Sequence, residues 1–291
     1  MGVSAGRPST HMEKKPTECY SEFSKGVIIG PTSLADTIQH KEKGKREKVE
    51  NRYLAPVAET GEKEPIFIVP SAGATFFSFL ALGKALKANR PLYSFSLTEL
   101  KVTDSENSTI QEIASTLLKE LRDCQPKGPY FLGGHCWGGV VAFEMASQLE
   151  ADGQTVGGLF LFESFVPIIQ GSISNYKTGQ MDEFQEDMTR IVEETLDEAR
   201  AKLAKLPKVH IDRLVALTDN QMKTSNTYET SPIQAPIHLF KTDLHTDLVF
   251  EGWEALTHSS FAKHRASGET HTMLNEPHVQ EICRTLEALL I

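Results

Sequence analysis

The sequence is poor in cysteine, has no basic excess and contains no long apolar run. Its four cysteines match neither a zinc-site spacing nor a disulfide framework, which indicates a reducing, cytoplasmic compartment. Lys and Arg total 30 against 39 Asp and Glu, and a net charge of −9 argues against nucleic-acid binding. Because no run reaches about 18 apolar residues, we expect no membrane-spanning helix and no membrane association.

Several motifs that would indicate a bound nucleotide or metal are also missing. The P-loop, the glycine-rich dinucleotide fingerprint and the zinc-protease motif do not occur, and the histidines show no metal-type spacing. We therefore expect no metal and no bound cofactor. What remains is an ordinary globular composition, with 40% hydrophobic and 24% charged residues in 291, enough for one large domain with an appendage.

The first 52 residues differ from the rest. Residues 1–12 (MGVSAGRPSTHM) are small and polar, and we interpret them as a remnant of recombinant expression. Residues 13–52 contain one helical pattern around Leu34 and Ile38, followed by a highly charged run that predicts a solvated linker. The main domain is therefore predicted to span residues 53–291.

Within that domain, short apolar runs alternate with helical patterns. The runs predict strands at 53–57, 66–69, 92–95, 130–132, 159–162 and 237–240. Unbroken apolar strands separated by helices predict an α/β fold, with a mostly parallel sheet covered by helices on both faces. A helical stretch at about 165–232 interrupts the alternation, and we interpret it as an insertion that either covers a site or caps the fold.

The strongest local signal is the segment Gly134-His-Cys-Trp-Gly-Gly139, between a predicted strand and a predicted helix. It is the G-x-S-x-G nucleophile elbow with cysteine in place of serine. Glycines let the backbone turn sharply, and the helix N-terminus favours a thiolate. We therefore predict that Cys136 is a nucleophile rather than a buried structural cysteine.

A cysteine nucleophile needs a base, and in elbow folds the histidine comes late in the chain. His271 and His278 both precede the predicted last helix. We favour His271, because it lies in a short turn that can place the ring more freely than a helix can. His135 flanks the nucleophile, and we interpret it as structural.

Two acidic residues are candidates for the group that orients the base. Glu163 ends the strand at 159–162, and Asp243 follows the strand at 237–240. Both lie at carboxyl ends of strands, where α/β sheets build their sites.

The oxyanion of an acyl-transfer reaction needs backbone N–H donors. One comes from the residue after the nucleophile, which is Trp137. For the second we choose Ala72, in the small-residue loop Pro70–Ala74 that follows a buried strand.

From about Tyr53 to Ile291, the chain resembles the C-terminal thioesterase domains of polyketide synthases and non-ribosomal peptide synthetases, which have an α/β-hydrolase fold. The similar segments are the Pro70–Ala74 loop, the elbow at 128–139, Leu159–Ser164, and Gly268 to Leu274 with His271 between them. The resemblance implies that Glu163 outranks Asp243 as the acid, and that the insertion is the family's lid. Cysteine for serine and glutamate for aspartate are departures from the family's common pattern.

The resemblance also implies the reaction. The substrate is expected to arrive as an acyl or peptidyl thioester on the phosphopantetheine arm of an upstream carrier protein. The segment Gly30–Ile38 resembles the last helix of such a carrier protein. A Cys136 acyl-enzyme is itself a thioester, which amines attack well and water slowly, so we expect aminolytic cyclisation or transfer over hydrolysis. Three alternatives stay open: a stand-alone editing (type II) thioesterase, a small-molecule hydrolase like the dienelactone hydrolases, and a non-catalytic hydrolase-fold binding module.

Overall fold

The protein is described here from a computed structural model. The structure describes residues 53–97, 108–166, 228–244 and 250–290, together with residues 190, 193, 218, 221 and 223–225. The predictions for residues 1–12 and 13–52, and most of the insertion at 165–232, lie outside the described residues. Among the described residues, no helix is long and apolar enough to cross a bilayer.

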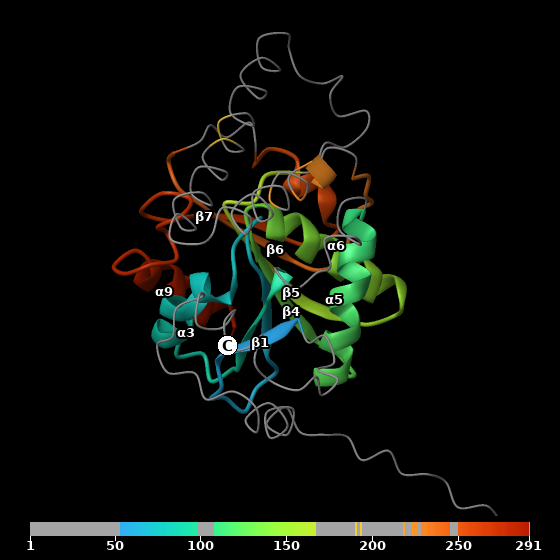
Figure 1. Ribbon diagram of the computed structural model, residues 1–291, viewed down its shortest axis with the longest axis horizontal. Coiled ribbons are helices and arrows are strands. Elements are labelled where there is room, and N and C mark those ends of the chain that lie inside the picture. The colour runs from blue at the N-terminus through green and yellow to red at the C-terminus, as the bar shows by residue number, and fades with distance from the viewer. Residues whose placement is uncertain are drawn as a thin grey trace, which may run out of the picture.

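Seven strands form one sheet in the order β1-β3-β2-β4-β5-β6-β7 (Figure 1). Only β1 runs antiparallel, against β3, and the other neighbours pair in parallel. The strands are β1 (Leu54–Ala58), β2 (Ile66–Val69), β3 (Leu92–Phe95), β4 (Tyr130–His135), β5 (Val156–Phe162), β6 (Ile237–Lys241) and β7 (Phe261–Arg265). The predicted mostly parallel α/β sheet is confirmed.

β7 is not among the predicted strands, because it lacks an apolar run. Its sequence FAKHR is half exposed at the edge of the sheet, where only β6 pairs with it. An edge strand needs no second apolar face, so its composition resembles that of a loop.

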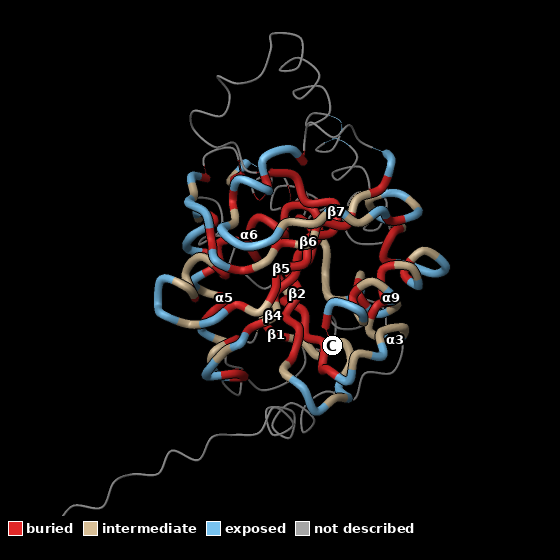
Figure 2. Tube along the Cα trace, turned by 180° about the vertical axis from the view of Figure 1, so that it is seen from behind, coloured by how far each residue is buried: buried red, intermediate tan, exposed pale blue. Residues whose placement is uncertain are grey.

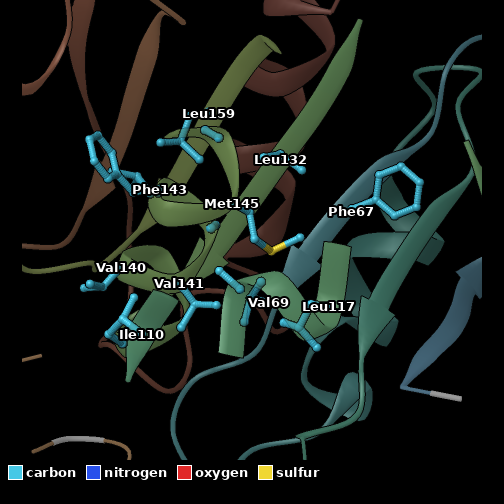
Figure 3. Close-up of a cluster of buried hydrophobic side chains, with 14 of the residues drawn as sticks. Phe67, Val69, Ile110, Leu117, Leu132, Val140, Val141, Phe143, Met145 and Leu159 are labelled. Carbon is cyan, nitrogen blue, oxygen red and sulfur yellow. The ribbon is translucent and has the colours of Figure 1, made fainter. Parts of the chain in front are cut away.

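Helices cover both faces of the sheet, as Figure 1 shows. On one face, α5 (Ile110–Cys124) packs against α6 (Trp137–Ala151), and on the other, α3 (Leu80–Ala85) packs against α9 (Val279–Leu289). Figure 3 shows the core under α5 and α6, where Val141 and Met145 of α6 belong to the same buried cluster as Leu132 of β4. Buried segments fill the centre of the molecule and exposed ones lie outside it (Figure 2).

Local sequence explains how these helices begin. Thr109 and Glu112 form a reciprocal capping box at the start of α5, each side chain bonding the other's backbone N–H. Residues 76–85 form a 3-10 turn, η2 (Phe76–Phe79), followed directly by the short α3. A further 3-10 turn, η7 (Trp253–Leu256), precedes β7.

Parallel strands place their carboxyl ends at one edge of the sheet. The loops that leave β2, β4, β5, β6 and β7 therefore start at this edge, and they carry the candidate residues Ala72, Cys136, Glu163, Asp243 and His271.

Candidate active site

Cys136 occupies a strained turn between β4 and α6. Its backbone angles are φ +51° and ψ −123°, a region that residues with a side chain rarely adopt. Its N–H donates to the carbonyl of Phe162 at 2.8 Å, and its own carbonyl accepts from Gly139 at 3.0 Å. The strain is thus held by the neighbouring strand and by the first turn of the helix.

The glycines of the elbow are required by close backbone approach. A Cβ on Gly134 would overlap the backbone of Gly138, and a Cβ on Gly138 would overlap the carbonyls of Val69 and Pro70 at the end of β2. The first turn of α6 therefore lies directly against the Pro70–Ala74 loop. Cys136 is buried, with 1% of its surface exposed, so access to the sulfur requires the atoms that cover it to move apart.

The two residues predicted as oxyanion donors lie on the two segments that make this contact. Ala72 belongs to the Pro70–Ala74 loop and Trp137 is the first residue of α6, and both are buried. Within the described part of the chain, neither backbone N–H donates a hydrogen bond. Both N–H groups therefore stay available for the predicted role.

Glu163 follows β5 directly and is 3% exposed. Its backbone has φ +46°, and its N–H donates to the Phe240 carbonyl at 2.8 Å. The Thr242 N–H donates to carboxylate oxygen Oε1, whereas Oε2 has no partner among the described residues. Burial raises the pKa of this carboxyl, and the Thr242 N–H opposes the rise.

Asp243 has a different environment. Its carboxylate is 70% exposed and pairs with the guanidinium of Arg265, which is 78% exposed. Oδ2 accepts from Arg265 Nε at 3.1 Å. A solvated ion pair accounts for this side chain without any role in orienting a base.

His271 lies in the turn between β7 and α9, as predicted, and its side chain is 47% exposed. Ring Nε2 lies 3.5 Å from Oε2 of Glu269, and among the described residues the ring makes no other polar contact. The structure therefore brings the turn to the correct edge but does not join the ring to Glu163 or Cys136. His278 caps α9, where Nδ1 lies 3.0 Å from the Ser267 hydroxyl.

His135, which the sequence predicts to be structural, contacts the turn before α9, and Ser164 and Thr242 support the site without having been predicted to do so. His135 Nε2 lies 2.7 Å from the Thr270 carbonyl oxygen, and the Ser164 hydroxyl donates to the Gly134 carbonyl at 3.2 Å. Thr242 supplies the N–H that Glu163 accepts. A usable signal existed, because Ser164 and Thr242 are both small polar residues after buried strands: Thr242 directly follows β6, and Ser164 is the second residue after β5. Among the described residues, no group of His, Cys, Asp or Glu is arranged to hold a metal ion.

Comparison with known proteins identifies the family of this chain. The family model for the thioesterase domain matches residues 64–290. Vanchrobactin synthetase VabF of Vibrio anguillarum is 27% identical over 241 residues, covering 79% of this chain and 8% of the synthetase. The non-reducing polyketide synthase terA of Aspergillus terreus is 25% identical over 250 residues, covering 77% of this chain and 12% of the synthase.

Among solved structures, the Vlm2 thioesterase domain with 2,3-diaminopropionic acid and a bound dodecadepsipeptide superimposes with a TM-score of 0.62. It is 22% identical and covers 81% of this chain and 97% of that chain. The fold is thus the α/β-hydrolase fold of thioesterase domains. The chain itself spans only a small fraction of the two curated relatives named above. On the match over residues 64–290, this chain belongs to the thioesterase domain family.

Proposed function

We propose that this chain releases or transfers an acyl or peptidyl chain from the phosphopantetheine thioester of a carrier protein, through an acyl-enzyme on Cys136. One observation carries the proposal: Cys136 is held at φ +51° between β4 and α6, and among the described residues the N–H groups of Ala72 and Trp137 donate no hydrogen bond. Strain of this kind at the end of a strand is typical of a functional site. Since the relatives are long synthetases, an upstream carrier domain is the expected partner.

The first half-reaction forms the acyl-enzyme. The thiol of Cys136 loses its proton to the imidazole of His271, and the sulfur attacks the thioester carbonyl. The N–H groups of Ala72 and Trp137 stabilise the oxyanion. The bond from the carbonyl carbon to the pantetheine sulfur then breaks, and His271 returns the proton to that leaving sulfur.

The second half-reaction releases the chain. An amine attacks the carbonyl carbon of the Cys136 thioester, and His271 takes the proton that the amine loses. The bond from the carbonyl carbon to the Cys136 sulfur breaks, which leaves the acyl chain joined to the amine as an amide, and His271 returns the proton to the sulfur. An amine on the same chain gives a ring, and one on another molecule gives transfer. The thioester keeps its activation until this nucleophile arrives, which favours aminolysis over hydrolysis.

Glu163 is the acid that best fits the orienting role. Among the described residues its buried Oε2 accepts no hydrogen bond, and an imidazolium would satisfy it and compensate its burial. The mechanism requires the His271 ring to leave Glu269 and turn toward Glu163. The carboxylate of the solvated Asp243 does not need an imidazolium partner in the same way, since Arg265 already pairs with it.

The acyl-enzyme is tested with a pantetheine-linked acyl mimic and intact-protein mass spectrometry. We expect the wild-type chain to gain the acyl mass on Cys136, and Cys136→Ala to gain none. Cys283 serves as the internal control, because burial raises its pKa to about 12 and should leave it unlabelled. Acylation of Cys136→Ala at the wild-type rate would exclude this nucleophile.

Product analysis tests the release step. With an amine-bearing mimic, the wild-type chain should form mainly the amide, whereas Cys136→Ser should shift toward free acid. For the acid, Glu163→Ala should lower the acylation rate by up to about 10⁴, and Asp243→Ala should leave it close to wild type. A wild-type product that is entirely free acid would contradict aminolysis but leave the thioesterase assignment standing.

A further inference from the structure

A short part of the insertion lies against the Pro70–Ala74 loop, which carries the proposed oxyanion donor Ala72. Thr218, Gln221 and Ser225 are all buried, and their spacing of three and four residues places them on one helical face. A polar face buried in this way must find partners within the protein or a ligand. Gln221 on this face and the nearby Thr224 make two contacts, one to the residue after Ala72 and one to the side chain of Trp137.

The first contact fixes the peptide that follows Ala72. Gly73 N–H donates to Oε1 of Gln221 at 3.0 Å. Because that N–H can only donate, the oxygen of the amide must face it. Gly73 has φ +68°, and a Cβ there would overlap the Thr218 hydroxyl, so the loop and the insertion are in direct contact.

The second contact reaches the other side of the oxyanion hole. The indole Nε1 of Trp137 donates to Oγ1 of Thr224 at 3.1 Å, and the same hydroxyl donates to the Gln221 carbonyl at 2.6 Å. One helical turn of the insertion, from Gln221 to Thr224, thus holds the loop of one proposed donor and the side chain of the other.

The buried amide of Gln221 lowers the folding stability of the protein. It is 2% exposed, and Nε2 has no partner among the described residues. A buried unsatisfied donor costs about 1–3 kcal/mol, so an apolar side chain of similar size would serve folding as well or better. Residues that sacrifice stability in this way are typical of functional positions.

We propose that Gln221 and Thr224 are positioning residues that hold the N–H groups of Ala72 and Trp137 in register as one oxyanion hole, through the Gly73 N–H and the Trp137 indole. This inference rests on the proposed function, because it assumes an oxyanion at Cys136. The contacts act on the transition state and not on the bound thioester, so they should affect kcat and leave KM unchanged.

The test compares Gln221→Met and Thr224→Val with wild type in single-turnover acylation by the pantetheine-linked mimic. Each variant should acylate roughly tenfold more slowly, with KM within about twofold of wild type. The Tm of Gln221→Met should stay within about 2 °C of wild type, since one unsatisfied group replaces another. Thr224→Ser retains the hydroxyl and should restore the rate. Gln148→Met, on α6 away from the site, is the matched control.

Hydrogen exchange of the 70–74 loop gives a readout independent of activity. Gln221→Met should exchange the Gly73 amide faster than wild type and than Gln148→Met. Unchanged exchange, a wild-type acylation rate, or a rise in KM alone would each overturn the inference. A wild-type chain that fails to acylate at all, with faster Gly73 exchange in the variant, would instead refute the proposed function and leave the loop contact standing.

Discussion

His135 Nε2 lies 2.7 Å from the carbonyl oxygen of Thr270, a residue 135 positions further along the chain. His135 immediately precedes Cys136, and Thr270 immediately precedes His271. This hydrogen bond therefore ties the side chain next to Cys136 to the backbone of the turn that carries the proposed base. A carbonyl oxygen can only accept, so Nε2 carries the proton.

This relationship gives the first prediction. His135→Phe keeps the ring shape but loses the donor, and we expect acylation to slow by about 10–100-fold because the base is misplaced. His135→Gln places an amide N–H near the position of Nε2 and should stay within a few-fold of wild type. Single-turnover acylation measures both variants, and equal rates for Phe and wild type would show that the tether does not matter.

Glu163 gives a prediction about stability. Its raised pKa means that the folded state binds a proton more tightly than the unfolded state, so stability falls as pH rises above the ordinary Glu value of about 4.3. The Glu163→Gln variant does not lose stability in this way as pH rises, because its amide does not ionise, and its side-chain oxygen can still accept the hydrogen bond from the Thr242 N–H. We expect the Tm advantage of Glu163→Gln over wild type to grow between pH 4 and pH 7, reaching about 2–4 °C, while its acylation rate falls.

The control for Glu163 is Asp243→Asn. Asp243 is exposed and ion-paired at the surface, and surface pairs contribute little to stability. Its Tm difference from wild type should stay small and nearly constant over the same pH range. A Glu163→Gln variant whose Tm advantage does not change with pH would contradict the account of its burial.

Gly139 in the first turn of α6 gives a packing prediction. Gly→Ala in a helix usually stabilises by about 1 kcal/mol, but a Cβ here would overlap the hydroxyl and Cβ of Ser164. We therefore expect Gly139→Ala to destabilise by about 1–3 kcal/mol in urea unfolding. Ser164→Gly in the same chain should recover part of the loss, and a stable Gly139→Ala would show that the elbow tolerates more room than its packing indicates.

His238 and His264 lead us to expect that the stability of the protein falls at acid pH. His238 Nδ1 lies 3.2 Å from His264 Nε2, and each ring stacks on a phenylalanine, Phe160 or Phe240. Burial lowers the pKa of both, and the charge of His264 lowers that of His238 further. The unfolded state then binds protons first, so stability is full above about pH 6.5 and falls as pH drops below it.

The measurement is Tm against pH from 7.5 to 5. His264→Gln removes one titrating ring and can still bond to His238, so its Tm should fall less than that of wild type over this range. His278→Gln, a histidine at the surface end of α9, is the comparison. Equal pH slopes for His264→Gln and wild type would remove the pair as the cause.

The sequence predicted the fold well wherever a strand is buried on both faces. The runs at 66–69, 92–95 and 159–162 are unbroken and apolar because helices cover both sides, and each is a strand with the predicted bounds or close to them. β7 was not legible, since an edge strand packs on fewer neighbours. The elbow was legible too, because Gly134 and Gly138 are required by backbone contacts that no other residue permits.

The sequence alone determined the α/β class, the strand-to-helix turn at Cys136, and the appearance of polar residues after buried strands, because these depend on local periodicity and on glycine. Only the tertiary structure distinguished the buried Glu163 from the solvated Asp243, and only it joined His135 to Thr270 and Gln221 to Gly73. Burial and contacts between segments more than a hundred residues apart depend on how the strands stack side by side, and no local pattern encodes that.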